Sequence, residues 1–281
     1  MIVKALNKEH KRVKKRSIVY DLFYNDTIQK APLIIFCHGY KGFKDWGAWN
    51  LLAEAFALQG IAFLKFNFSH NGGTVTQPVD FPDLAAFAEN NYSKELEDLD
   101  SVIEMVSNSY KNHTALDVET LILMGHSRGG GIVTIKTSED SRVKKLITLA
   151  GVSDYKSRFP QGEALKIWQE KGVYFIENGR TKQKMPHNFQ FYQDFIAHEN
   201  RLSIENAATK ISIPHLIVHG DADSTVPFFE ANQLKLWSKP SIIYKVRGGD
   251  HVFGAKHPWE IPEMPRDLEL IFSKILDFIN N

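Results

Sequence analysis

The chain has 281 residues, of which 43% are hydrophobic and 24% charged, and its formal net charge is +1. This composition excludes a disordered chain, and the length suffices for one domain with a large core. The balanced charge argues against nucleic acid as a partner. Neither a signal peptide nor an apolar run of about 18 residues stands out. We therefore expect a cytoplasmic protein without a membrane partner.

The first feature along the chain is a strongly basic run from Lys8 to Arg16. Residues 13–24 alternate between apolar and polar side chains, which predicts an antiparallel hairpin at the edge of a sheet. Lysines at such an edge discourage the addition of another strand. We interpret the basic run in this way, and not as a site for nucleic acid or an anionic membrane.

After this hairpin, short apolar runs alternate with stretches of helical periodicity. The strand-like runs are 33–37, 61–66, 121–124, 145–149, 215–219 and 242–246, and the helical stretches are 45–58, 93–109, 127–136, 228–236 and 267–279. Such alternation predicts an α/β fold with a mostly parallel, doubly wound sheet covered on both faces. The single cysteine, Cys37, ends the first run and is predicted to be buried.

One interval breaks the alternation, because about sixty residues separate Ala150 from Pro214. A crossover needs far fewer. We predict an inserted helical cap over 152–208, with 1–151 and 209–281 forming the core domain. The cap is rich in aromatic residues, most of which we expect to form its own small core: Tyr155, Phe159, Trp168, Tyr174, Phe175, Phe189, Phe191, Tyr192 and Phe195.

The strand-like run 121–124 leads directly into Gly125-His126-Ser127-Arg128-Gly129, a G-x-S-x-G pattern. A serine exposed on a sharp turn between strand and helix requires small residues two positions before and after it. Gly125 and Gly129 occupy these positions. The pattern predicts a nucleophile elbow of Gly125, His126 and Gly129 that carries Ser127 as the nucleophile.

A serine nucleophile needs a base, and the base needs a carboxylate that orients it. Two aspartates, Asp221 and Asp223, follow the run 215–219, and His251 follows the run 242–246. The order Ser, Asp, His is the order of the α/β-hydrolase triad. His251 is the predicted base, and both aspartates are candidates for the acid.

With His38-Gly39-Tyr40-Lys41-Gly42 added to these motifs, the chain resembles the α/β-hydrolase superfamily over almost its whole length. It is most similar to the branch that includes cinnamoyl (feruloyl) esterases, dienelactone-hydrolase-like proteins and acyl-peptidase-like proteins. That branch places its acid in a His-Gly-x-x-Asp-x-x-Val-Pro pattern, so the resemblance implies Asp223, with Asp221 bonding backbone donors. It also implies an oxyanion hole formed by the backbone N–H groups of Tyr40 and Arg128.

Three other histidines lie at the ends of strand-like runs, namely His38, His126 and His219. We expect them to hydrogen-bond surrounding loops and to have no direct part in catalysis. No cluster of His, Cys, Asp and Glu has the spacing of metal ligands, and no phosphate-binding loop follows a strand, so neither a metal nor a cofactor is expected.

The predicted function is that of a serine carboxylesterase, which cleaves small aromatic or medium acyl esters through an acyl-enzyme. Its partner is a small-molecule ester, and an exposed sheet edge or apolar cap surface would support a homodimer. One alternative is a serine peptidase or acylaminoacyl-peptidase-like enzyme, whose cap charges Glu163, Glu170 or Arg180 would bind a peptide terminus. The other is a ligand-binding protein without enzymatic activity.

Overall fold

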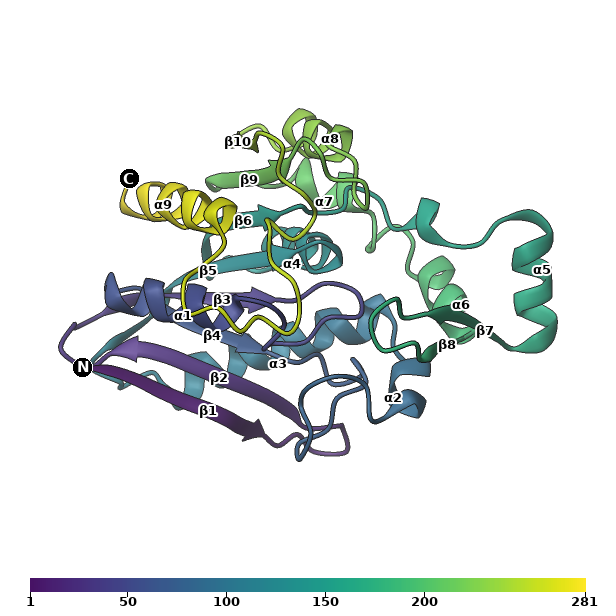
Figure 1. The fold of residues 1–281 in the computed structure, drawn as a ribbon, viewed down its shortest axis with the longest axis horizontal. Coiled ribbons are helices and arrows are strands. Elements are labelled where there is room, and N and C mark those ends of the chain that lie inside the picture. The colour runs from purple at the N-terminus through teal and green to yellow at the C-terminus, as the bar shows by residue number, and fades with distance from the viewer.

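The computed structural model describes residues 1–281 and is built around one sheet of eight strands (Figure 1). Their order across the sheet is β1-β2-β4-β3-β5-β6-β9-β10. The bounds of these strands are β1 Ile2–His10, β2 Ile18–Asn25, β3 Ala31–Cys37, β4 Ala62–Phe66, β5 Leu116–His126, β6 Val143–Leu149, β9 His215–Gly220 and β10 Ser241–Val246. All six strand-like runs of the sequence are strands of this sheet.

The six neighbouring strands β4, β3, β5, β6, β9 and β10 pair in parallel. In contrast, β1 pairs with β2, and β2 with β4, in antiparallel fashion. The structure thus confirms a mostly parallel sheet with antiparallel strands at its N-terminal edge. Strand β3 shows why its sequence is apolar throughout. Leu33 and Ile35 face one hydrophobic cluster, while Ile34 and Phe36 face the other, so both faces of the strand are buried.

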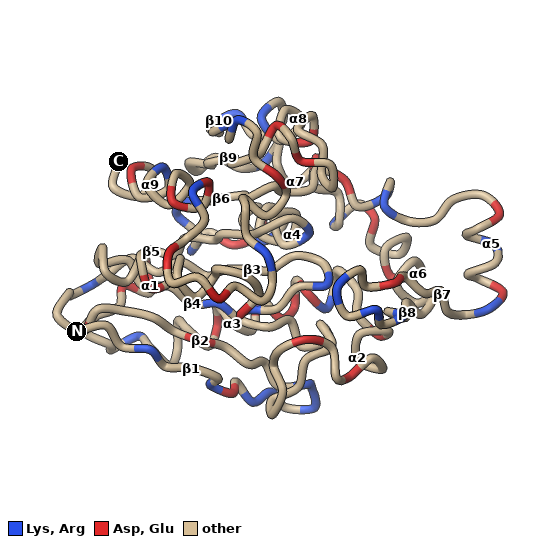
Figure 2. Tube along the Cα trace, viewed as in Figure 1, with Lys and Arg blue, Asp and Glu red and all other residues tan.

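The N-terminal hairpin differs from its prediction, because its strands span 2–10 and 18–25 and the intervening residues 11–17 form the connection. The predicted hairpin over 13–24 was therefore wrong in its first strand. Basic side chains of the connection form ion pairs instead: Arg12 with Asp98, Lys15 with Glu97 and Arg16 with Asp83. Figure 2 shows Lys and Arg gathered at this end of the hairpin.

Helices cover both faces of the sheet. Buried residues of α1 (Trp49–Leu58) and α9 (Arg266–Asn280) pack on one face, and those of α3 (Tyr92–Ser109), α4 (Arg128–Glu139) and α8 (Phe229–Trp237) pack on the other. The five predicted helices are these five, with ends shifted by a few residues. No helix is long and apolar enough to cross a membrane.

The predicted cap segment, residues 152–208, extends from the end of the sheet where the parallel strands finish (Figure 1). It contains η1 Lys156–Arg158, α5 Gly162–Lys171, β7 Val173–Glu177, β8 Lys184–Asn188, α6 Gln190–Ala197 and α7 Ile204–Ala208. Strands β7 and β8 form a separate antiparallel sheet, so the segment predicted as a helical cap contains two strands beside its helices. A short helix, α2 (Leu84–Ala88), packs against β8, and α7 packs against α4 and α8.

Candidate active site

Ser127 occupies the sharp turn between β5 and α4, and its backbone has φ 56° and ψ −120°. Non-glycine residues rarely adopt a positive φ, and such strain persists only where the surrounding structure enforces it. Here the Ser127 amide donates to the carbonyl of Leu149 at 2.9 Å, and the Ser127 carbonyl accepts from the amides of Gly130 and Val152. These bonds hold the turn against β6 and the first turn of α4.

The two motif glycines have a steric reason in this turn. A Cβ on Gly125 would lie 2.5 Å from the carbonyl carbon of Gly129, and a Cβ on Gly129 would lie 2.6 Å from the carbonyl oxygen of His38. Both distances are far below van der Waals contact. A side chain at Gly125 would push helix α4 away, and a side chain at Gly129 would push α4 away from the end of strand β3.

The three residues predicted from the Ser, Asp, His order lie together. His251 Nε2 is 3.0 Å from Ser127 Oγ, and His251 Nδ1 is 2.8 Å from Asp223 Oδ2. Ser127 follows β5, Asp223 follows β9 and His251 follows β10. Because these strands are parallel, their carboxyl ends bring the three loops to one edge of the sheet.

Asp223 is buried and accepts several hydrogen bonds. Its Oδ1 accepts from the amides of Thr225 and Val226 at 2.8 Å each, while Oδ2 accepts from His251. Burial alone would raise the pKa of Asp223, but the rings of His219 and His251 and the Val226 amide outweigh it. The pKa of this carboxyl is thereby held well below its usual range, which keeps it ionised beside the imidazole.

The other aspartate of the turn, Asp221, is directed elsewhere, because its Oδ1 accepts a hydrogen bond from the Gly248 amide at 2.6 Å. The three histidines that the sequence places at the ends of strand-like runs contact loops, as expected. His126 Nε2 donates to the His251 carbonyl at 2.8 Å, His219 Nε2 donates to the Val226 carbonyl at 2.7 Å, and His38 Nε2 accepts from the Phe68 amide at 3.3 Å. Of these, His126 directly supports the loop that carries His251.

The residues predicted to form an oxyanion hole flank Ser127. Arg128 is the first residue of α4, whose leading amides lack intrahelical acceptors. Tyr40 follows Gly39, on which a Cβ would lie 3.0 Å from the Cβ of Ser127. No protein group accepts a hydrogen bond from the Tyr40 amide. Both loops that carry the predicted donors therefore lie against the serine.

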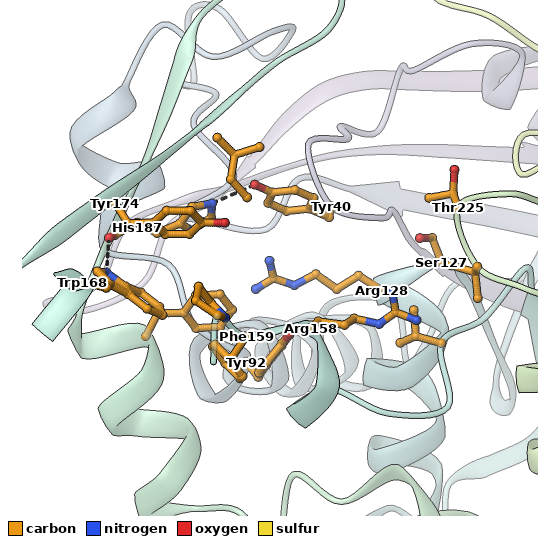
Figure 3. Close-up of a pocket in the computed structure, with 15 residues that line it drawn as sticks. Tyr40, Tyr92, Ser127, Arg128, Arg158, Phe159, Trp168, Tyr174, His187 and Thr225 are labelled. Carbon is orange, nitrogen blue, oxygen red and sulfur yellow. Dashed lines mark hydrogen bonds between the residues drawn. The ribbon is translucent and has the colours of Figure 1, made fainter. Parts of the chain in front are cut away.

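A cavity of about 160 Å³ opens at Ser127 and extends beneath the cap segment (Figure 3). Most of its lining is aromatic or aliphatic, with two arginines among the polar groups: Tyr40, Tyr92, Ser127, Arg128, Val152, Arg158, Phe159, Pro160, Trp168, Tyr174, Ile176, His187, Phe191, Thr225 and Val226. Ser127 lies at one end, and Trp168 and Tyr174 lie at the other.

The predicted cap segment contributes much of this lining. Four of the nine cap aromatics line the cavity, namely Phe159, Trp168, Tyr174 and Phe191, and others such as Tyr155 pack into the core. The cap charges proposed for a peptide terminus do not line it: Glu163 and Glu170 are exposed, and Arg180 pairs with Asp80.

The sequence does not reveal three polar or aromatic residues of the lining, Tyr92, Arg158 and His187, since no local motif marks them. No three His, Cys, Asp or Glu side chains cluster as metal ligands would.

The comparison with protein families agrees with this geometry. The family model described as the alpha/beta hydrolase fold matches residues 32–174, just over half of the chain. The chain belongs to the α/β-hydrolase fold family. The match includes β3 and the whole strand-turn-helix unit around Ser127. None of the curated proteins compared with this α/β-hydrolase matches it.

Solved structures similar to this α/β-hydrolase share its fold at low sequence identity. Est1E from Butyrivibrio proteoclasticus has a TM-score of 0.65 and 18% identity, with 95% of each chain covered. The esterase domain of a Rhodothermus marinus protein has a TM-score of 0.65 and 17% identity, with 99% of this chain and 97% of that chain covered. The acylaminoacyl peptidase of Pyrococcus horikoshii has a TM-score of 0.67 and 16% identity, with 100% of this chain and 41% of that chain covered.

Proposed function

We propose that this α/β-hydrolase is a serine carboxylesterase in which Ser127 is the nucleophile, His251 the base and Asp223 the orienting acid. The observation that carries the proposal is the hydrogen-bonded chain from Ser127 Oγ to His251 Nε2 at 3.0 Å and from His251 Nδ1 to Asp223 at 2.8 Å. Such a chain activates a hydroxyl that is otherwise a weak nucleophile.

The reaction proceeds in two acyl transfers. Ser127 Oγ attacks the ester carbonyl carbon while its proton passes to His251 Nε2, and the amides of Tyr40 and Arg128 stabilise the oxyanion. The imidazolium, stabilised by Asp223, then protonates the leaving alcohol oxygen as the acyl-enzyme forms. Water that gives its proton to His251 attacks the acyl-enzyme, and collapse of the second tetrahedral intermediate releases the carboxylic acid and restores Ser127.

The cavity supports an ester with a small aromatic or medium acyl group, because aromatic rings line most of the space next to Ser127. An amide substrate with a free terminus receives less support. Its recognition would require charges aimed at the cavity, and the cap charges considered for this task lie elsewhere. Est1E has been solved with ferulic acid bound, and this suggests hydroxycinnamate esters for a first substrate panel.

The test is the hydrolysis of p-nitrophenyl and methyl esters of acetic, butyric, benzoic and hydroxycinnamic acids by the wild type, Ser127→Ala and Asp223→Asn. We expect each substitution to lower kcat by about 10⁴-fold or more, since triad members act as a unit. The matched control is Asp221→Asn, which keeps an acceptor for the Gly248 amide and should retain activity.

The outcomes separate the alternatives that the sequence leaves open. Ester turnover that survives Ser127→Ala would contradict the mechanism. Loss of activity in Asp221→Asn with retention in Asp223→Asn would reverse the assignment of the acid. Turnover of acyl-peptides faster than of any ester in the panel would support the amide hydrolase instead, and ligand binding without any turnover would support a non-enzymatic protein.

A further inference from the structure

The guanidinium of Arg128 lies inside the cavity next to the predicted nucleophile. In Figure 3 the side chain runs from beside Ser127 toward the middle of the cavity, with Tyr40 and His187 on one side and Tyr92 and Phe159 on the other. Arg128 Cζ lies 4.5 Å from the ring centroid of Tyr92 and 5.7 Å from that of Tyr40. The residue is only 8% exposed.

This buried guanidinium has donors without acceptors. Its single side-chain hydrogen bond runs from Nε to Glu95 Oε2, at 3.1 Å. The terminal nitrogen Nη2 is fully buried and has no hydrogen-bond partner. A guanidinium carries five N–H donors, and leaving buried donors unpaired is costly. Because this guanidinium lines the cavity and only its Nε has an acceptor, its terminal nitrogens indicate where an acceptor of a bound molecule would lie.

The charges around the cavity are already balanced in pairs. Glu95, which also accepts from Asn90 Nδ2 at 2.8 Å, neutralises Arg128. The second arginine of the lining, Arg158, pairs with Glu230. A carboxylate brought into this cavity would add an uncompensated charge to a mostly apolar site, whereas a neutral acceptor oxygen would not.

We propose that the Arg128 side chain is the specificity determinant of the acyl pocket, where its terminal nitrogens donate to an uncharged acceptor oxygen on the far part of the acyl group. This inference rests on the proposed esterase function. It predicts flat, aromatic or unsaturated acyl groups that carry a ketone, ether or phenol oxygen away from the ester carbonyl. The flanking rings of Tyr40 and Tyr92 fit the flat part, and Arg128 binds the oxygen.

The test compares two esters of matched shape, methyl 4-acetylbenzoate and methyl 4-isopropenylbenzoate, in which a CH2 group replaces the acceptor oxygen. Their dissociation constants are measured by calorimetry on Ser127→Ala protein, which keeps Arg128 and does not consume the ligand. We expect the acetyl ester to bind at least about tenfold more tightly, as a hydrogen bond to a charged donor allows. Equal affinities would overturn the inference.

The role of Arg128 is tested by adding Arg128→Met and Glu95→Gln to Ser127→Ala, so that no carboxylate remains buried without its partner. The preference for the acetyl ester should fall to about onefold, a change that a purely structural role for Arg128 would not produce. Restoration of part of the preference by Arg128→Lys alone would support the same role. If the Met and Gln variant does not fold, the comparison on Ser127→Ala protein still decides.

A third ligand, monomethyl terephthalate, places a carboxylate where the acetyl group stands. Tighter binding of this anion than of the acetyl ester would overturn the choice of an uncharged oxygen. The inference about Arg128 and the proposed esterase function can fail separately, and the experiments distinguish the two cases. Wild-type turnover with no preference between the neutral esters would overturn only the inference about Arg128, and a clear preference in binding without wild-type turnover would overturn only the esterase function.

Discussion

At the scale of single residues, the turn at Ser127 depends on what its neighbours lack. The positive φ of Ser127 is held by hydrogen bonds to Leu149, Gly130 and Val152. The space that this turn occupies exists because Gly125 and Gly129 carry no side chain. A methyl group at either glycine would collide with backbone and not with a flexible side chain, so it could be accommodated only by moving Ser127.

We therefore expect Gly129→Ala to lower both stability and activity. Overpacking against the carbonyls of Cys37 and His38 should cost at least about 2 kcal/mol of the free energy of unfolding, measured by urea denaturation. Displacement of Ser127 by about 1 Å should lower kcat/KM by about 100-fold. The matched control is Gly179→Ala, where an added Cβ meets nothing within 4 Å. Equal stability and activity of the two variants would contradict the steric account.

Residues of the site differ in how far the sequence predicts them. Ser127 and Asp223 stand in short sequence patterns with glycines at the turns, and His251 follows an apolar run directly. The sequence alone therefore distinguishes these three residues. Glu95 and Tyr92 stand in a helix with ordinary amphipathic spacing, and nothing local distinguishes them from core residues. Only the packing of α3 against α4 brings them to Arg128.

At the scale of elements, the carboxyl ends of β3, β5, β9 and β10 place the loops of the site at one edge of the sheet. The loops after β5, β9 and β10 carry the predicted triad, and the loop after β3 carries Tyr40. This arrangement explains why parallel strands matter for function here. Loops far apart in sequence meet without any of them needing to be long.

The elements that the sequence predicts well are those buried on both faces. Strands β3, β4 and β9 are buried along nearly their whole length, as are the C-terminal parts of β5 and β6, and their apolar runs predicted them. The edge strand β10 was also predicted from its apolar run, although it is partly exposed. Strand β1 was missed because its residues are half-buried or exposed, and β7 for the same reason. Such strands carry a weak hydrophobic signal, since tertiary pairing and not burial defines them. The limits 152–208 of the cap stay a prediction.

At the scale of the whole molecule, several buried histidines are held neutral by the fold. Burial is the main cause in each case, and it lowers the pKa of four histidines from 6.5 to about 4 for His38 and to about 3 for His126, His187 and His215. The unfolded chain binds protons at these rings below about pH 6.5, whereas the folded chain does not. Acid therefore favours the unfolded state.

We predict that the free energy of unfolding falls steadily as the pH is lowered from 6.5 toward 4. Each such histidine contributes up to about 1.4 kcal/mol per pH unit in this window, and its contribution is fully present above pH 6.5. Asp98 opposes the trend, because burial raises its pKa to about 6 and the folded state takes up that proton first. Urea denaturation at pH 7, 6, 5 and 4.5 measures the slope.

A single substitution tests how much His215 contributes to the dependence of the free energy of unfolding on pH. His215 lies in the core between the hydroxyls of Thr148 and Ser238. His215→Gln should make the decline with acid shallower than in the wild type, because it removes one of the rings whose pKa burial lowers. A wild-type stability that is constant from pH 6.5 to 4.5 would contradict the account of buried neutral histidines.

The central claim is that Ser127 is an activated nucleophile, and covalent labelling tests it most directly. Intact-mass measurement after treatment with an organophosphonate probe reports the number of reactive serines without any assumption about the substrate. The account predicts one adduct on the wild type and on the exposed control Ser141→Ala, and none on Ser127→Ala. An unlabelled wild type, or an adduct that persists on Ser127→Ala, would contradict it.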